Sequence, residues 1–157
     1  MTLAADILQA AKAKGVMIAT AESCTGGMVS AALTDIPGSS AIFDRGFVTY
    51  TNAAKMKMLS VSPSALTKFG AVSEAVALEM ARGALAHSDA QIAVSITGIA
   101  GPGGSDHKPE GRVCFAIAHG AASKAETIDF GALGRPQVRQ SATTHALTLL
   151  LQAVTKN

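Results

Sequence analysis

The chain has 157 residues, of which 48% are hydrophobic and 15% charged, and its formal net charge is +2. This length fits one domain with a real core, so we expect a single domain over residues 1–157, and the low charge fraction leaves room for the apolar interface of a homodimer or higher homo-oligomer. No apolar run approaches the ~20 residues of a membrane span, the basic residues are scattered, and a signal peptide is lacking; we therefore expect a cytoplasmic protein with no membrane or nucleic-acid partner.

The first half of the chain alternates between helical and extended patterns. An amphipathic helix over residues 3–14 ends at a glycine and leads into a strand that starts at residue 16. A Ser-Cys-Thr-Gly-Gly loop then opens into a helix over about 26–34. The segment 41–50 has strand character that an Asp-Arg-Gly step interrupts, which predicts a strand with a bulge or a bend.

The second half continues the alternation and then ends differently. Short helices are predicted over residues 52–59, 63–69 and 74–87, and a buried strand follows over 91–97. The last predicted elements are a strand over 112–118, a strand over 126–130 joined to it as a hairpin through 119–124, and a helix over about 135–154. These elements predict an α/β fold, a three-layer α/β/α sandwich around a mixed β-sheet.

The loop after the first strand has the features of an anion site. Gly26 and Gly27 permit close approach of the backbone to a ligand, and the start of a helix offers unpaired N–H groups. Ser23 would therefore hold its hydroxyl beside an oxyanion site formed by the N–H groups of residues 25–27. The alternative is that Ser23 or Thr25 only caps the helix.

A serine nucleophile needs a base, and the sequence offers few. No histidine occurs at either glycine-rich strand end and the G-x-S-x-G elbow is absent, which argues against a Ser-His-Asp triad. Lys55, near Tyr50 and in the first turn of a helix, is the better placed lysine, and burial could lower its pKa enough for it to act as a base. The alternative is a solvated lysine. Cys24 is intrinsically the better nucleophile, but its position favours a small buried residue.

Metal chemistry finds no support in the sequence. The two cysteines, Cys24 and Cys114, form neither a disulfide framework nor a metal motif. The four histidines show no ligand spacing. We expect no metal and no cofactor.

Several motifs in order resemble one known family. They are Ala21-Glu22-Ser23-Cys24-Thr25-Gly26-Gly27, Asp35-Ile36-Pro37-Gly38-Ser39-Ser40, Gly46-Phe47-Val48-Thr49-Tyr50-Thr51-Asn52 with Lys55, Gly70-Ala71-Val72-Ser73, and Thr97-Gly98-Ile99-Ala100-Gly101-Pro102. Together they resemble the CinA C-terminal domain family, and the resemblance extends from about residue 5 to 155. That family often carries a separate N-terminal domain, whereas this chain resembles the stand-alone form.

The resemblance implies a function and a set of site residues. It implies a metal-independent amidohydrolase that converts nicotinamide mononucleotide to nicotinic acid mononucleotide and ammonia in pyridine-nucleotide recycling. The catalytic positions that match are Ser23 as nucleophile, Lys55 as general base, and Tyr50. The substrate-binding positions are Thr25, Gly26, Gly27, Thr97, Gly98 and Arg139, with Arg139 expected near the substrate phosphate and Arg135 as the alternative.

One departure and two rival functions complete the prediction. The loop Gly101-Pro102-Gly103-Gly104-Ser105 is one residue shorter than the common family form, so we expect it to close over the substrate differently. The first rival is a non-catalytic nucleotide-binding module linked to competence or the DNA-damage response. The second is an amidase for another small carboxamide, which the sequence alone does not separate from an amidase for nicotinamide mononucleotide.

Overall fold

The computed structural model describes residues 2–105 and 107–156. Asp106, in the polar tract that follows the second glycine loop, lies outside the described residues. Five strands form one sheet in the order β2-β1-β3-β4-β5. They are β1 (Ile18–Glu22), β2 (Phe43–Val48), β3 (Ile92–Gly98), β4 (Arg112–His119) and β5 (Ala122–Asp129). Strands β1, β2 and β3 run parallel to one another. Strand β4 pairs antiparallel with β3, and β5 pairs antiparallel with β4, so the sheet is mixed as predicted.

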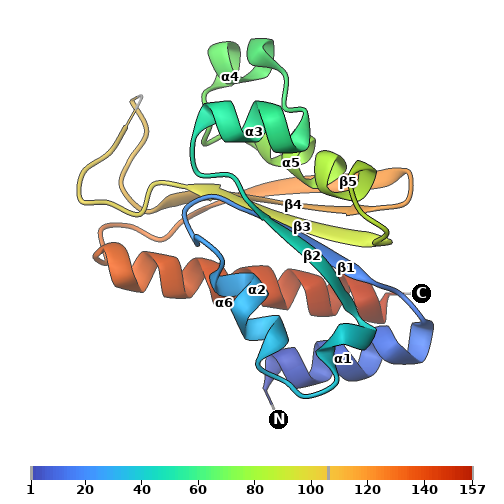
Figure 1. The fold of residues 1–157 in the computed structure, drawn as a ribbon. Helices are drawn as coiled ribbons and strands as arrows, with labels where there is room; N and C mark the ends of the chain where they lie inside the picture. The colour runs from blue at the N-terminus through green and yellow to red at the C-terminus, as the bar shows by residue number, and fades with distance from the viewer. Residues whose placement is uncertain (1, 106, 157) are drawn as a thin grey trace.

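Helices cover both faces of the sheet. They are α1 (Leu3–Lys14), α2 (Met28–Thr34), the 3-10 turn η1 (Ser39–Ala41), α3 (Asn52–Leu59), α4 (Pro63–Phe69), α5 (Glu74–Ala86) and α6 (Arg135–Thr155). Figure 1 shows α1, α2 and α6 on one side of the strands and α3, α4 and α5 on the other. The predicted three-layer α/β/α architecture is confirmed.

The side chains of β1 show how the two layers share one strand. Ile18 packs in the core that includes α1, α2 and α6, whereas its neighbour Ala19 packs with α5 on the opposite face. All five residues of β1 are buried. A strand buried on both faces is typical of the middle of a parallel sheet, and β1 lies between β2 and β3.

Helix boundaries follow the capping residues in the sequence. The side chains of Thr2, Thr51, Ser62 and Ser73 each accept the hydrogen bond of a first-turn N–H at the start of α1, α3, α4 and α5. Helix α2 is different, because its N-cap residue is Gly27 and has no side chain to offer. A residue elsewhere must satisfy the N–H groups at its start.

The structure confirms the irregularity predicted in β2 and corrects the bounds of the predicted hairpin of β4 and β5. The bulge in β2 is confirmed, since Ile18 pairs with Phe43 but Ala19 pairs with Arg45, so that Asp44 has no partner. The hairpin prediction was wrong in its bounds, because β5 starts at Ala122 and pairs there with His119. Small and exposed residues begin β5 without the apolar alternation that marks a strand, and a two-residue turn at Gly120 (φ 60°) suffices.

The order of the strands places a crevice at their carboxyl ends. The chain leaves β1 through α2 on one face of the sheet, and leaves β2 through α3 on the other. In open α/β sheets, such a reversal leaves a ligand-binding crevice beyond the carboxyl ends of the strands. Here the loops that follow β1 and β3 border it, and these are the two glycine-rich loops of the sequence.

Candidate active site

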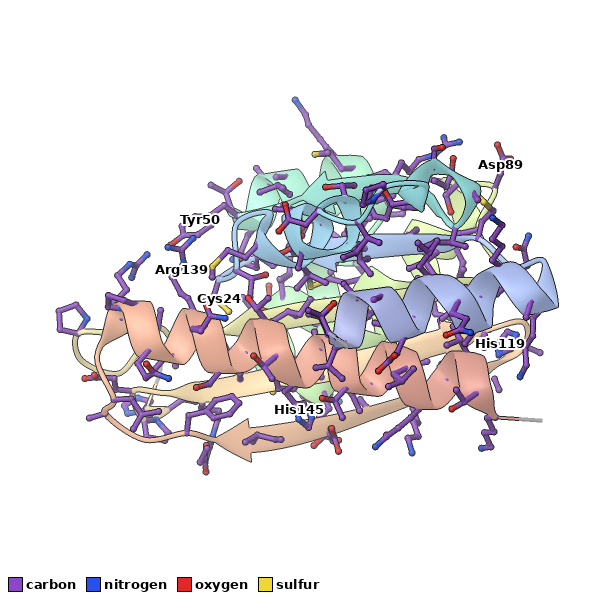
Figure 2. The ribbon with its side chains drawn as sticks, turned by 90° about the horizontal axis from the view of Figure 1, so that it is seen from below. Cys24, Tyr50, Asp89, His119, Arg139 and His145 are labelled. Atoms are coloured by element: carbon purple, nitrogen blue, oxygen red, sulfur yellow. The ribbon has the colours of Figure 1, made fainter. Side chains whose placement is uncertain are left out.

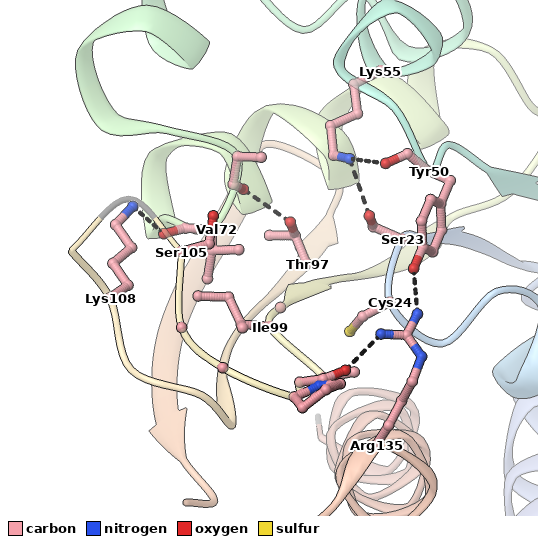
Figure 3. A pocket seen from close by; sticks show the side chains of 17 residues that line it. Ser23, Cys24, Tyr50, Lys55, Val72, Thr97, Ile99, Ser105, Lys108 and Arg135 are labelled. Atoms are coloured by element: carbon pink, nitrogen blue, oxygen red, sulfur yellow. Dashed lines mark hydrogen bonds between the residues drawn. The ribbon is translucent and has the colours of Figure 1, made fainter. Parts of the chain in front are cut away.

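A pocket of about 340 Å³ opens where these two loops face each other. Figure 3 shows Ser23 and Lys55 at one side of it and the loop with Ile99 and Ser105 at the other. The lining residues are Ser23, Cys24, Tyr50, Lys55, Ala71, Val72, the segment 97–105, Lys108 and Arg135. Residues from seven separate stretches of the chain therefore form one site.

Lys55 contacts Ser23 inside this pocket. Helix α3, capped by Thr51, places Lys55 in its first turn and directs the side chain toward the end of β1. The side chain is only 1% exposed, and Nζ lies 3.0 Å from Ser23 Oγ. Nζ also donates to the backbone carbonyl oxygens of Thr49 (2.9 Å) and Tyr50 (3.2 Å). The predicted serine and lysine are thus brought into direct contact.

This arrangement suits the amine of Lys55 to accept the hydroxyl proton of Ser23. Burial lowers the pKa of Lys55 from 10.5 to about 8, because the charged form loses its hydration. A neutral amine has two hydrogens and one lone pair. The two carbonyl groups accept the hydrogens, so the lone pair is left for the hydroxyl proton of Ser23.

Glu22 organises the loop that carries Ser23. Its side chain is fully buried and its carboxylate accepts five hydrogen bonds from one stretch of chain. The donors are Thr25 Oγ1, the N–H groups of Gly27, Val29 and Ser30, and Ser30 Oγ. Glu22 therefore supplies the cap that Gly27 lacks and neutralises the positive end of α2.

This arrangement corrects the predicted oxyanion site. The N–H of Gly27 is bonded to Glu22, and the N–H of Gly26 donates to the carbonyl of Ser23 (3.0 Å). Both groups are therefore committed within the loop. Among the described residues, no acceptor is found for the N–H groups of Cys24 and Thr25. Of these two residues Cys24 lines the pocket, whereas Thr25 is fully buried, so the N–H of Cys24 is the donor that this loop leaves unpaired at the pocket.

Cys24 borders the pocket but is not activated. The residue is buried, and desolvation raises the pKa of its thiol to about 12, even though Arg139 and Lys55 act in the opposite direction. A thiol that stays protonated is a poor nucleophile. The geometry therefore favours Ser23 over its neighbour.

Tyr50 contributes through two different groups. Its carbonyl binds Lys55, while its ring is 56% exposed at the rim of the pocket. The hydroxyl accepts a 2.6 Å hydrogen bond from Arg135 Nη2, and Arg135 Nη1 donates to Gly101 O (2.8 Å). Figure 3 shows Arg135 reaching from α6 between Tyr50 and the second glycine loop. Arg135 thus joins the two sides of the pocket.

The opposite wall is held by hydrogen bonds to backbone carbonyls. Thr97 Oγ1 donates to Ala71 O (2.8 Å), which ties the end of β3 to the segment between α4 and α5. Lys108 Nζ donates to the carbonyls of Phe69 and Val72 and closes the same wall from the loop before β4. Gly98 lies so close to β4 that a Cβ there would come within 2.7 Å of Val113.

The predicted site residues therefore divide into two groups. Those that line the pocket are Ser23, Tyr50, Lys55, Thr97 and Gly98. Those that lie behind the lining are Thr25, Gly26, Gly27 and Arg139. Arg139 Nε instead donates to Cys24 O (3.0 Å), so Arg135, the alternative, is the arginine in the pocket.

Sequence reasoning did not assign Lys108, Glu22 or the segment 71–72 to the site. The second glycine loop was a signal for residues 99–105, because a glycine-rich strand end borders the same crevice. Lys108 had no such signal, since its partners Phe69 and Val72 lie more than 30 residues away in the chain.

Two negative findings concern the part of the chain that the structure describes. Across residues 2–105 and 107–156, no three His, Cys, Asp or Glu side chains are grouped so as to hold a metal ion. Within the same residues, the helices are too short or too polar to cross a bilayer.

The fold and the pocket define an α/β/α protein with a buried serine–lysine pair at the carboxyl ends of parallel strands. The chain belongs to the CinA C-terminal domain family, whose model matches residues 1–154. It is 49% identical, over all of its length and 96% of the relative's, to the nicotinamide-nucleotide amidohydrolase PncC of Escherichia coli K12. It is 50% identical, over 99% of its length and 95% of the relative's, to the PncC protein of Enterobacter agglomerans.

A solved structure supports the fold. The crystal structure of the competence/damage inducible protein CihA from Agrobacterium tumefaciens superposes with a TM-score of 0.94 at 48% identity. The superposition covers 98% of this chain and 94% of the other. The family that the sequence motifs indicate is therefore confirmed.

Proposed function

We propose that the chain is a nicotinamide-nucleotide amidohydrolase that hydrolyses nicotinamide mononucleotide to nicotinic acid mononucleotide and ammonia through Ser23 and Lys55. The observation that carries the proposal is the 3.0 Å contact of Lys55 Nζ with Ser23 Oγ in the wall of the pocket. The full-length relatives that bear this name support the choice of substrate. A pure binding module would have no need of a buried lysine held against a serine.

In the acylation step, Ser23 Oγ bonds to the carboxamide carbon as its proton moves to neutral Lys55 Nζ. The carbonyl electron pair moves to the oxygen, where the N–H group of Cys24 stabilises it. The C–N bond then breaks and the leaving nitrogen takes the proton from Lys55, so that ammonia departs. The positive pyridinium ring of the substrate makes the carboxamide carbon more electrophilic.

In the second step, water hydrolyses the ester on Ser23. Lys55 accepts a proton from the attacking water and returns it to Ser23 Oγ as the ester bond breaks. The product leaves as a carboxylate, with its proton released to solvent. Both steps use the same base.

The pocket suits an anionic mononucleotide. Its volume of about 340 Å³ lies at the small end of the roughly 300–1,000 Å³ that ligand sites occupy. Arg135 and Lys108 place two positive groups in the lining, and the five N–H donors of an arginine suit a phosphate. Arg135 is therefore the phosphate ligand of the proposal.

Ammonia release from nicotinamide mononucleotide tests the reaction. We expect Ser23→Ala and Lys55→Ala each to lose about 10³-fold or more in kcat, because members of a catalytic pair act as a unit. Lys57→Ala, an exposed lysine of the same helix, is the matched control and keeps parental activity. If the parent protein releases no ammonia while both it and Ser23→Ala bind the nucleotide tightly, the chain is a nucleotide-binding module and not an amidohydrolase.

A second comparison tests the substrate class. Arg135→Ala should raise KM for the mononucleotide about 10-fold or more and leave KM for nicotinamide riboside, which has no phosphate, nearly unchanged. Equal turnover of the two compounds by the parent would point to an amidase for another small carboxamide.

We further propose that the enzyme acts in the cytoplasm as a homodimer or higher homo-oligomer. Several large apolar side chains are exposed, among them Val48, Met56, Met58, Phe69 and Leu133. Contiguous exposed apolar surface is characteristic of interfaces. Light scattering during gel filtration should give at least twice the monomer mass of 15.8 kDa, and a monomer at micromolar concentration would refute the oligomer.

A further inference from the structure

Arg139 contacts the nucleophile loop from behind. It lies in the second turn of α6, and Nε donates to Cys24 O (3.0 Å) while Nη2 donates to Thr25 O (3.4 Å). Figure 2 shows Arg139 extending from α6 to the loop that carries Cys24. The guanidinium does not line the pocket, so it serves the backbone of the loop and not a ligand in the pocket.

The contact fixes the direction of one peptide group. In a trans peptide the C=O and the N–H point in opposite directions, and the bonds of this loop are trans. Arg139 binds the carbonyl of Cys24, which shares its peptide group with the N–H of Thr25. The preceding peptide is fixed in the same manner, since Gly26 N–H binds the carbonyl of Ser23 and leaves Cys24 N–H on the opposite side.

We propose that Arg139 is a positioning residue that holds the Cys24–Thr25 peptide in place, so that Ser23 Oγ and the N–H of Cys24 keep their positions around the oxyanion formed on Ser23. The inference rests on the proposed amidohydrolase reaction. The guanidinium bonded to the Cys24 carbonyl keeps the backbone on both sides of Cys24 in one conformation. The positive charge behind the loop also stabilises the negative charge that develops in front of it.

Gly26 leaves room for the approach of Arg139. A Cβ at Gly26 would meet Arg139 Nη2 at 3.3 Å, within a tight contact. Gly26 has φ 57°, so an alanine there carries some backbone strain as well. Gly15 has nearly the same backbone (φ 66°) with nothing within 4 Å of its Cβ position, which makes it a matched control for that strain.

The kinetic test separates positioning from binding. With nicotinamide mononucleotide, Arg139→Lys and Arg139→Met should lower kcat about 10- to 100-fold, less than the 10²–10³ of a lost oxyanion donor, with KM within about twofold of the parent. Lysine retains the charge and one donor, so Arg139→Lys should retain more activity than Arg139→Met. Gly26→Ala should lower kcat in the same way and Gly15→Ala should not. A large rise in KM with kcat preserved would show that Arg139 is a substrate ligand and overturn the proposal.

A second readout does not depend on the natural substrate. A fluorophosphonate is attacked by Ser23 Oγ, the P–F bond breaks and the phosphonyl oxygen uses the same N–H donor. Its labelling rate, followed by intact mass, should fall in both Arg139 variants while the pH midpoint of labelling stays at that of the parent, because Arg139 does not contact Lys55. Labelling at the parental rate in both variants overturns the proposal. If the parent labels at Ser23 but releases no ammonia from the mononucleotide, the proposed substrate fails while the labelling comparison still decides the role of Arg139.

Discussion

Lys55 can serve as the base of the proposed mechanism because its surroundings give its ammonium form less stabilisation than water does. The side chain is buried beside a neutral hydroxyl and two neutral carbonyls, and the structure gives it no carboxylate partner in the described ion pairs. Desolvation is therefore the dominant influence on its pKa. A lysine with a carboxylate neighbour would have stayed protonated at neutral pH.

The pH dependence of turnover follows from the lowered pKa of Lys55. Its neutral form is the base, so kcat/KM should rise about tenfold per pH unit well below the pKa of about 8 and level off above it. The measurement is ammonia release between about pH 6 and pH 9.5 under conditions where the enzyme stays folded. A rate that is flat across this range, or that falls as pH rises through 8, would show that neutral Lys55 is not the base.

At the scale of elements, α2 depends on a carboxylate in the preceding strand. Glu22→Gln removes one of the two oxygens and the charge at the start of α2, and leaves buried donors unpaired. At about 1–3 kcal/mol for each unsatisfied buried donor, we expect the free energy of unfolding to fall by about 2–4 kcal/mol. Urea denaturation measures this.

An exposed carboxylate provides the control for Glu22. Asp129 on β5 forms an ion pair with Arg112 on β4, and its carboxylate is half exposed. Asp129→Asn breaks this ion pair and should lower the free energy of unfolding by less than about 1 kcal/mol. Equal losses for the two substitutions would contradict the role given to Glu22.

A second element-level contact positions the helix that carries Lys55. In α5, a Cβ on Gly83 would come within 2.0 Å of the carbonyl oxygen of Leu59, at the end of α3. Alanine is normally better than glycine in a helix by about 1 kcal/mol, yet here the clash with rigid backbone outweighs that gain. Gly83→Ala should lower both the free energy of unfolding and kcat, because α3 must shift and Lys55 shifts with it. Unfolding at higher urea concentration than the parent would contradict this packing.

At the scale of the whole molecule, local signals in the sequence account for most of the fold. The capping residues Thr51, Ser62 and Ser73 and the glycine after α1 mark helix ends through contacts a few residues apart, and these boundaries are confirmed. The beginning of β5 was missed because its pairing with β4, and not its own pattern, makes it a strand. The periodicity of a sequence does not show that a segment of small residues will pair with a neighbouring strand.

The site was predictable to the extent that its residues lie in recognisable motifs. Ser23 and Lys55 occur in motifs of the family, and the structure brings them together. The functions of Arg139 and Glu22 depend on which backbone groups their side chains reach, across 115 residues in the case of Arg139. Such contacts exist only in the folded molecule, which is why the sequence suggested a phosphate ligand where the structure has a loop contact.

The most direct measurement of the central claim is mass spectrometry of the enzyme quenched with acid during turnover of nicotinamide mononucleotide. Attack by Ser23 with loss of ammonia predicts a nucleotide ester on the peptide that contains Ser23, absent from Ser23→Ala, which should also release no ammonia above background. An adduct on Cys24, or parental turnover by Ser23→Ala, would contradict the serine–lysine mechanism.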